Sequence, residues 1–122
     1  MATPFNLIVA GGRDFSDYPR METALFAFAE RLEGDYEINI VSGMAKGADN
    51  LAVRFCRSHG VNLIEMPADW NQYGKSAGYR RNSDMAAIAH GLIAFWDGKS
   101  RGTSHMINIA QKRGLLVQIE RY

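Results

Sequence analysis

The sequence predicts an α/β fold, a three-layer sandwich with a five-stranded, mainly parallel sheet in the order 3-2-1-4-5. Short apolar runs alternate with helical patterns along the whole chain of 122 residues. Such a β-α-β alternation is the signature of a parallel sheet with helices on both faces. No internal repeat, charge block or linker interrupts it, so we expect a single domain over residues 1–122.

The predicted strands are five short apolar segments. Four of them are rich in β-branched residues, and three lack the polar alternation of a strand with one exposed face. They span residues 5–10, 37–41, 61–66, 92–96 and 115–120. The pattern indicates strands that are covered by helices on both faces.

The predicted helices lie between these strands. Asp17 can cap the first helix, which has Pro19 in its opening turn and an apolar stripe that ends at Leu32. The third helix is expected over about residues 76–89 and the fourth over about residues 103–113. The second has apolar residues at helical spacing, namely Ala48, Leu51, Ala52, Phe55 and Cys56.

The glycines divide between the two edges of the predicted sheet. Four follow a helix and precede a strand, where a left-handed helix cap is expected: Gly34, Gly60, Gly91 and Gly114. The other eight lie where strands lead into helices: Gly11, Gly12, Gly43, Gly47, Gly74, Gly78, Gly98 and Gly102. Ligands of open α/β sheets bind beyond the carboxyl ends of the strands. The distribution therefore predicts a site at the ends of the first, second and fourth strands.

Composition argues against several classes of protein. Fourteen basic and 13 acidic residues leave a net charge of +1, so no basic field favours nucleic acid or an acidic membrane. The apolar stretches are far shorter than the roughly 20 residues that cross a bilayer. Cys56 is the single cysteine, which suits a reducing cytoplasm. From this we expect a cytoplasmic protein. Because no metal-ligand spacing is present, we expect no metal, and we also expect no cofactor.

The turn after the first strand can approach a ligand closely. Gly11 and Gly12 leave the backbone accessible, and Arg13 can grip a phosphate or carboxylate. The alternative is a tight turn in which Arg13 and Asp14 pair with each other or with a neighbour.

The segment after the second strand opens a helix with small residues, and a helix N-terminus attracts anions. Ser42 and Lys46 can add donors beside Gly43 and Gly47, and Asp49 can accept hydrogen bonds from a ribose. Alternatively, Asp49 only caps the helix and Lys46 is solvated.

The segment after the fourth strand repeats this arrangement. Asp97 and Gly98 end the strand, and Ser100, Gly102 and Thr103 open the last helix. Neither the glycine spacing of a P-loop nor a Gly-x-Gly-x-x-Gly motif is present, so binding of the dehydrogenase type is not supported.

A long loop is expected over residues 68–75, followed by the third helix. Trp70 and Tyr73 can stack on a base, while Arg81 or Asn82 reaches a phosphate or a ribose. The alternatives are a loop held by aromatic packing or a dimer contact.

The histidines give weaker indications. His59 and His90 fall in the last turns of helices, where a cation complements the helix dipole. His105 lies in the first turn of the last helix and can act as an acid or base, or face solvent.

Four motifs in this order resemble a known family. They read Gly-Gly-Arg-Asp-Phe, Ser-Gly-x-x-x-Gly-Ala-Asp, Trp-x-x-x-Gly-x-x-Ala-Gly-x-x-Arg-Asn and Phe-Trp-Asp-Gly-x-Ser-x-Gly-Thr. Over about residues 5–119 the chain is similar to the YspA/YpsA-related branch of the SLOG superfamily, which also contains LOG phosphoribohydrolases and DNA-processing proteins. The resemblance implies a Rossmann-like fold, a pocket for nucleotides or nucleotide-derived ligands, a bacterial or phage source and a homodimer.

The comparison with LOG enzymes is mixed. Arg81, Asn82 and Met85 resemble their Arg-Lys-x-x-Met segment, whose arginine belongs to the active site. Gly102-Thr103 resembles the Gly-Thr of their Pro-Gly-Gly-x-Gly-Thr-x-x-Glu motif, but Met106 stands where the catalytic glutamate is expected. A carboxylate normally stabilises the oxocarbenium-like state of N-glycoside cleavage. LOG-type hydrolysis therefore requires another carboxylate in place of the missing glutamate. The candidates are Asp97, Asp49 and Asp14.

The leading functional hypothesis is binding of a nucleoside phosphate, an ADP-ribose derivative or a related small molecule. Backbone amides near Gly12, Gly43–Gly47 and Gly102–Thr103 would hold phosphate, with Arg13 and Arg81 neutralising its charge. The enzymatic alternative is a phosphoribohydrolase or nucleosidase in which Arg81 grips phosphate and Asp97 stabilises the sugar cation. Binding of single-stranded nucleic acid is a third hypothesis, against which the near-neutral charge speaks.

Overall fold

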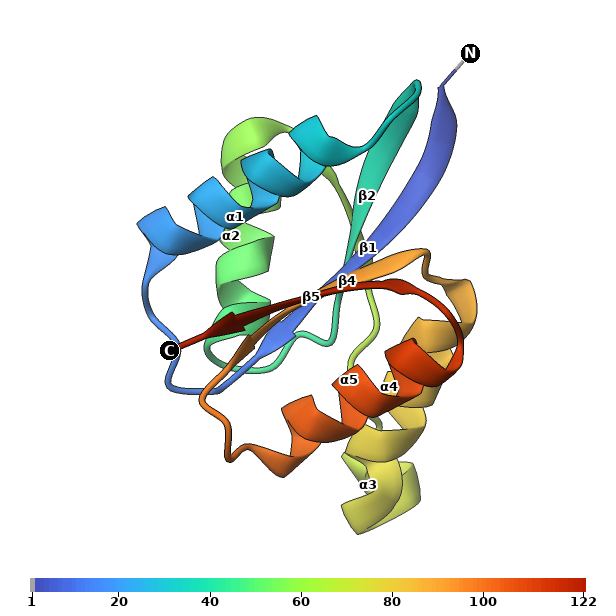
Figure 1. The fold of residues 1–122 in the computed structure, drawn as a ribbon. Coiled ribbons are helices and arrows are strands. Elements are labelled where there is room, and N and C mark those ends of the chain that lie inside the picture. Colours follow the sequence, from blue (N-terminus) through green and yellow to red (C-terminus); the bar gives the residue numbers. More distant parts are fainter. Residues whose placement is uncertain (1) are drawn as a thin grey trace.

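Five parallel strands form the centre of the protein in a computed structural model that describes residues 2–122 (Figure 1). Their order is β3-β2-β1-β4-β5, and every neighbouring pair is parallel, as predicted. The register sets Leu7 opposite both Ile40 and Gly91. The strands are β1 (Thr3–Gly11), β2 (Tyr36–Ser42), β3 (Asn62–Glu65), β4 (Gly91–Trp96) and β5 (Leu116–Arg121).

Helices cover both faces of this sheet, which confirms the three-layer, Rossmann-like architecture (Figure 1). One layer holds α1 (Tyr18–Arg31) and α2 (Ala48–His59). The other layer holds α4 (Ala77–Ile88) and α5 (Arg101–Lys112). Among residues 2–122, none of the helices has the length and apolarity that crossing a membrane requires.

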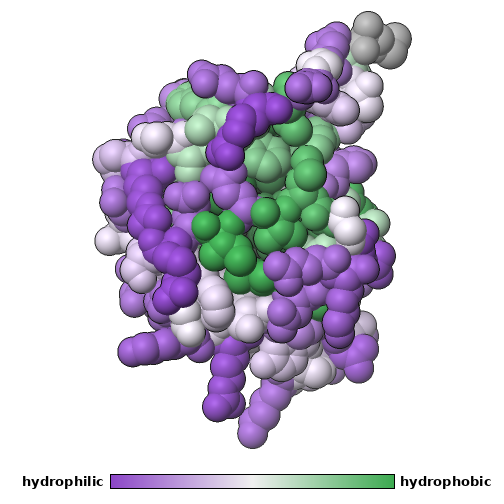
Figure 2. Space-filling model, in the orientation of Figure 1, coloured by the Kyte–Doolittle hydropathy of each residue, from purple (hydrophilic) through white to green (hydrophobic). Residues whose placement is uncertain are grey.

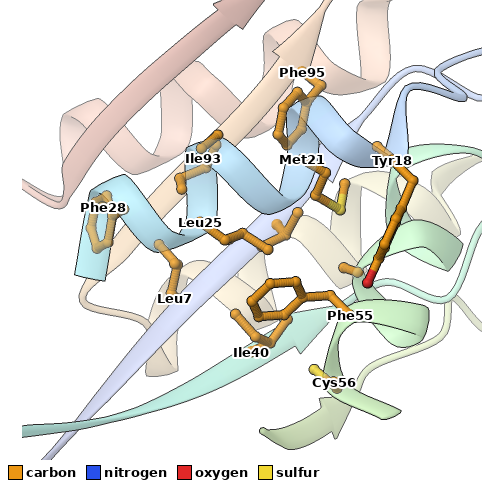
Figure 3. Packing of buried hydrophobic residues seen from close by; sticks show 14 of the residues in the cluster. Leu7, Tyr18, Met21, Leu25, Phe28, Ile40, Phe55, Cys56, Ile93 and Phe95 are labelled. Atoms are coloured by element: carbon orange, nitrogen blue, oxygen red, sulfur yellow. The ribbon is translucent and has the colours of Figure 1, made fainter. Parts of the chain in front are cut away.

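The core is divided by the sheet into two clusters, because successive side chains of a strand point to opposite faces. On β1, Leu7 and Val9 face α1 and α2, whereas Ile8 and Ala10 face α4 and α5. The α1/α2 cluster packs Met21, Leu25, Phe28 and Phe55 over the sheet (Figure 3). Buried on both faces, the central strands need apolar side chains at consecutive positions, and this explains their continuous apolar runs.

The first helix begins as the sequence predicts and ends one residue earlier. The Asp17 carboxylate accepts a hydrogen bond from the Arg20 amide at 3.1 Å, and a proline lies in the first turn. Leu32, expected at the end of the apolar stripe, is the extended residue after the helix, yet its side chain still packs against the core.

The segment predicted as a loop over residues 68–75 contains helical turns instead. It forms α3 (Trp70–Tyr73) and a 3₁₀ turn (Gly74–Ser76) that leads into α4. The Asp69 carboxylate caps α3 by accepting from the Gln72 amide at 3.1 Å. A single turn is too short to show an apolar periodicity, so the sequence pattern could not reveal it.

Two of the four glycines expected in left-handed caps have different roles. Gly60 caps α2 in the left-handed conformation, and Gly114, after α5, has a positive φ angle. Gly34 also has a positive φ angle, but the residue that caps α1 is the extended Leu32. Gly91 is instead the first residue of β4, where a Cβ atom would meet the Phe5 ring at 3.0 Å. Close packing, rather than backbone conformation, therefore requires a glycine at position 91.

Candidate functional site

A cavity of about 260 Å³ lies beyond the carboxyl ends of β1 and β2, between α4 and the start of α5. It is lined by the β1–α1 turn, the β2–α2 segment, α3 with α4, and the first turn of α5. This is the edge of the sheet where ligands of open α/β folds bind.

The cavity brings together about half of the candidate site residues. Those that line it are Gly11, Arg13, Asp49, Trp70, Arg81, Asn82, Ser100, Gly102 and Thr103. Those that do not are Gly12, Asp14, Ser42, Gly43, Lys46, Gly47, Asp97 and Gly98. The lining residues include two guanidinium groups, one buried carboxyl and one exposed indole.

Arg81 projects from α4 and is held by two hydrogen bonds. Its Nη1 donates to the Gly43 carbonyl oxygen at 2.6 Å, and its Nε donates to Asn82 Oδ1 at 3.1 Å. Burial lowers the pKa of Arg81, and the neighbouring Asp49 opposes that shift. The anchored guanidinium still has the Nη2 amino group, which makes no hydrogen bond to another residue in the described part of the chain.

Asn82 is buried and orients Arg81 from the neighbouring position on α4. Its Oδ1 accepts from Arg81, and its Nδ2 donates to the Gly102 carbonyl oxygen at 3.2 Å. The amide group therefore connects α4 to the first turn of α5 and fixes the arginine relative to that helix end.

Asp49 lies in the first turn of α2 and is only 6% exposed. Its Oδ2 accepts a hydrogen bond from the Ala45 amide at 3.2 Å. Burial raises the pKa of Asp49 to about 6, although the Ala45 amide, Arg81 and Arg13 all favour the ionised form. This carboxyl group can therefore exchange a proton close to neutral pH.

Gly43 makes room for both charged side chains. A Cβ atom at this position would clash with Arg81 Nη1 and would lie 2.9 Å from Asp49 Oδ2. Gly43 does not line the cavity, but its missing side chain allows the guanidinium and the carboxyl to approach each other there.

The backbone amides after β1 and β2 are largely used within the fold. The Gly12 amide donates to the Phe95 carbonyl oxygen at 3.0 Å, and the Met44 amide donates to Ser42 Oγ at 3.1 Å. The Ala45 amide is bonded to Asp49. These three amides are therefore occupied. At the start of α5 the Thr103 amide donates to Ser100 Oγ at 3.5 Å, whereas the Arg101 and Gly102 amides make no hydrogen bond within residues 2–122 and can bind an anion.

Asp97 and Asp14 stand outside the cavity. The Asp97 carboxylate accepts from the amides of Lys99 and Ser100, both at 2.8 Å, and these hydrogen bonds lower its pKa. Asp14 Oδ1 accepts from the Tyr122 hydroxyl at 2.5 Å. Asp97 therefore stabilises the turn in which it lies, and Asp14 links the β1–α1 turn to Tyr122.

Sequence reasoning missed several residues of the cavity. Tyr79 and Lys75 line it from α4 and the turn before α4, and the buried Met85 and Met106 form apolar parts of its wall. Tyr79 stands three residues before the Asn82 that points to the site, which is helical spacing, and this signal could have identified it.

Comparisons with known proteins agree with this fold. The YspA, cpYpsA-related SLOG family model matches residues 5–73. Gene 61 protein of Mycobacterium phage D29 is 36% identical over 118 residues, which cover 91% of this chain and 92% of that protein. DNA processing protein A of Streptococcus pneumoniae has a similar solved structure, with a TM-score of 0.69 and 20% identity over 96% of this chain. The chain matches 50% of that structure, and the likeness establishes the fold.

Proposed function

Because the chain belongs to the YspA, cpYpsA-related SLOG family, we propose that it binds a nucleotide or a nucleotide-derived small molecule in this cavity. The observation that carries the proposal is the anchored Arg81 guanidinium, which lines the cavity together with Gly102 at the start of α5. Guanidinium groups and helix N-termini are the groups that proteins use most readily to bind phosphate.

The phosphate end of the ligand belongs between α4 and α5. Arg81 supplies charge-assisted hydrogen bonds, and the exposed Arg13 adds a second positive charge at the rim. Gly102 lies at the start of α5, where a Cβ atom would meet nothing within 4 Å, so a phosphate can approach the backbone there. The positive end of the helix dipole favours the same anion.

The base end of the ligand belongs at the mouth of the cavity. Trp70 lines the mouth and is 52% exposed, which is unusual for so large an apolar side chain. Gly78 lies directly beside this indole, since a Cβ atom there would be in van der Waals contact with Trp70 Cη2 at 3.4 Å. An exposed indole of this kind can stack on any of the nucleobases, because each has a flat aromatic face.

A thermal-shift panel tests this proposal. AMP, ADP-ribose, NAD and cyclic ADP-ribose are each titrated against the wild type, Arg81→Ala and Arg57→Ala. Arg57 lies in the last turn of α2, is exposed and does not line the cavity, so its variant has the same change in net charge. We expect at least one compound to raise the Tm of the wild type and of Arg57→Ala but not that of Arg81→Ala. No shift with any of them would sink the proposal.

A second candidate function is hydrolysis of an N-glycosidic bond, and the buried Asp49 carboxyl favours it. The bond between ribose C1′ and the base nitrogen would break, and its electron pair would leave with the base. Protonated Asp49 would give its proton to that nitrogen, and water would add to C1′ and return a proton to Asp49. Asp49 from α2 brings a carboxyl group to the cavity, whereas Met106 from α5 brings an apolar side chain.

Mass spectrometry of the same mixtures separates the two candidates. Hydrolysis requires free base in the wild-type sample and none with Asp49→Asn. Stabilisation without released base between pH 5 and 8 would leave ligand binding as the function and exclude hydrolysis.

The remaining predictions concern partners and location. The structural neighbour is named a DNA-processing protein, but the net charge of +1 disfavours nucleic acid as the main ligand of this chain. Retention on single-stranded DNA that weakens with salt would reverse that view. A homodimer and a cytoplasmic location follow from the family resemblance and the composition, and sedimentation and cell fractionation test them.

A further inference from the structure

A second hollow adjoins the first cavity and shares Tyr79 with it. It has a volume of about 350 Å³ and lies along the outer side of the first turns of α5. Its walls include Trp96 from the end of β4, Lys99 from the following turn, and Arg101 and His105 from α5. Nothing in the proposed function uses this second hollow.

Aromatic side chains form its walls and are held in place. The Tyr79 ring, 45% exposed, packs on the His105 ring with 4.3 Å between ring centroids. His105 Nδ1 lies 3.2 Å from Asn82 Nδ2, so the partition between the hollows is tied to the residue that orients Arg81. Trp96 is fixed by its Nε1, which donates to the Ser100 carbonyl oxygen at 3.1 Å.

The charge of the second hollow suits an anionic ligand. Lys99 and Arg101 line it, and of the described residues that line it none is acidic. The carboxylate closest in sequence, Asp97, is already bonded to the amides of Lys99 and Ser100. By contrast, the first cavity contains the Asp49 carboxyl.

The first turn of α5 separates the two hollows and faces both. Ser100, Gly102 and Thr103 line the first, while Lys99 and Arg101 line the second. A phosphate at this helix end would therefore have an aromatic-walled hollow on each side, one beside Trp70 and one beside Trp96.

We propose that the ligand is a dinucleotide, two nucleosides joined through a pyrophosphate, with one nucleoside in each hollow and the phosphates at the start of α5. This inference rests on the proposed function of the first cavity. Tyr79 separates the two nucleosides, and Lys99 and Arg101 line the hollow of the second one, where a guanidinium can stack on its base. A mononucleotide would fill only the first hollow.

Calorimetric titration with ADP and with diadenosine diphosphate tests the inference, with the guanosine pair run in parallel. A second stacked base typically adds 1–3 kcal/mol, so we expect the dinucleotide to bind about tenfold more tightly or better. Lys99→Gln/Arg101→Gln should remove this advantage and leave ADP binding unchanged. Lys112→Gln/Arg113→Gln, at the far end of α5, removes the same charge and should preserve it.

Each outcome decides the inference. Equal affinity for ADP and the dinucleotide overturns it while the proposed function stands. A loss of both affinities in Lys99→Gln/Arg101→Gln also overturns it, because the second hollow would then serve the mononucleotide. Tighter binding of a single-stranded trinucleotide than of the dinucleotide points to nucleic acid instead. If none of these probes binds, this inference fails, and the thermal-shift panel decides the proposed function separately.

Discussion

The Arg81 guanidinium and the Asp49 carboxyl converge on one glycine. A Cβ atom on Gly43 would touch Nη1 of the first and Oδ2 of the second. Among residues 2–122, no direct ion pair joins the two side chains, although each favours the charged form of the other. Because the two side chains lie close together without forming an ion pair, both remain available to a ligand.

Gly43→Ala should displace Arg81 and weaken ligand binding. The new methyl group would occupy the position of Nη1, so the arginine would have to give up its bond to the Gly43 carbonyl oxygen. The φ angle of Gly43 is not positive, so an alanine there is not strained in its backbone. A charged hydrogen bond contributes about 1.5–3 kcal/mol, so we expect a loss of about tenfold to 100-fold in affinity by calorimetry.

A double-mutant comparison is the control for this prediction. In the Arg81→Ala background, Gly43→Ala should cause little further loss, because the side chain that it displaces is absent. Equal and additive losses in both backgrounds would show that Gly43 acts elsewhere.

Asp49 should make the protein less stable as the pH rises. Its pKa is about 6 in the folded state, against an ordinary value near 3.8. Because the folded state holds this proton more tightly, the stabilisation is complete below pH 4 and is lost as the pH rises through 6. The difference of about two pKa units corresponds to about 3 kcal/mol.

Urea unfolding at pH 4.5 and 7.5 measures this effect. The free energy of unfolding of Asp49→Asn should exceed that of the wild type by more at pH 7.5 than at pH 4.5. The asparagine keeps an oxygen to accept from the Ala45 amide, so this hydrogen bond survives. The same difference at both pH values would contradict the assignment of a raised pKa.

Tyr18→Phe should stabilise the fold. The Tyr18 hydroxyl is buried, and within the described chain it has no hydrogen-bond partner. Its ring packs against Arg54, whose guanidinium carbon lies 3.9 Å from the ring centroid, and phenylalanine preserves that contact. Removing an unsatisfied buried group should add about 1 kcal/mol, measured as a Tm increase of a few degrees.

Tyr122→Phe is the matched control for this substitution. The Tyr122 hydroxyl donates to Asp14, so its removal should lower the Tm by a similar amount. If Tyr18→Phe lowers the Tm as much as Tyr122→Phe does, the Tyr18 hydroxyl has a partner in solution.

Cys56 should be inert to thiol reagents in the folded protein. The side chain is 4% exposed on the inner side of α2, and burial raises the pKa of its thiol to about 11. Reaction requires an accessible thiolate, so a chromogenic disulfide at pH 8 should label it only after urea is added. Equally fast labelling without urea would mean that α2 opens readily.

The strand order and the edge that carries the site could be predicted, because both follow from local patterns. Alternating strands and helices indicate a parallel sheet, and the glycines that end the strands mark its carboxyl edge. The hydrogen-bond partners of the backbone amides after these strands could not be predicted in the same way. Whether the Gly12 amide faces a ligand or the Phe95 carbonyl oxygen depends on the pairing of β1 with β4.

The side chains that complete the site come from elements far apart in the sequence. Arg81 on α4 reaches the Gly43 carbonyl oxygen after β2, and spacing along the chain does not encode that contact. The sequence indicates Arg81 as a phosphate-binding candidate, both from its place after the Trp70 segment and from the family motif, but it does not single out Tyr79. Asp97 has the residue type and the position, at the end of a strand, that are expected of a site residue. Its carboxylate, however, accepts hydrogen bonds from two amides of its own turn.

A titration of the ¹⁵N-labelled protein with ADP-ribose, followed in its amide and arginine Nε correlation spectra, tests whether a nucleotide-derived ligand binds between Arg81 and the start of α5. Binding there should cause saturable shifts of the Gly102 and Thr103 amides and of Arg81 Nε–H. Gly34, Gly60 and Gly114, at the opposite edge of the sheet, should not move. Saturable shifts at those three glycines, with Arg81 unchanged, would contradict it.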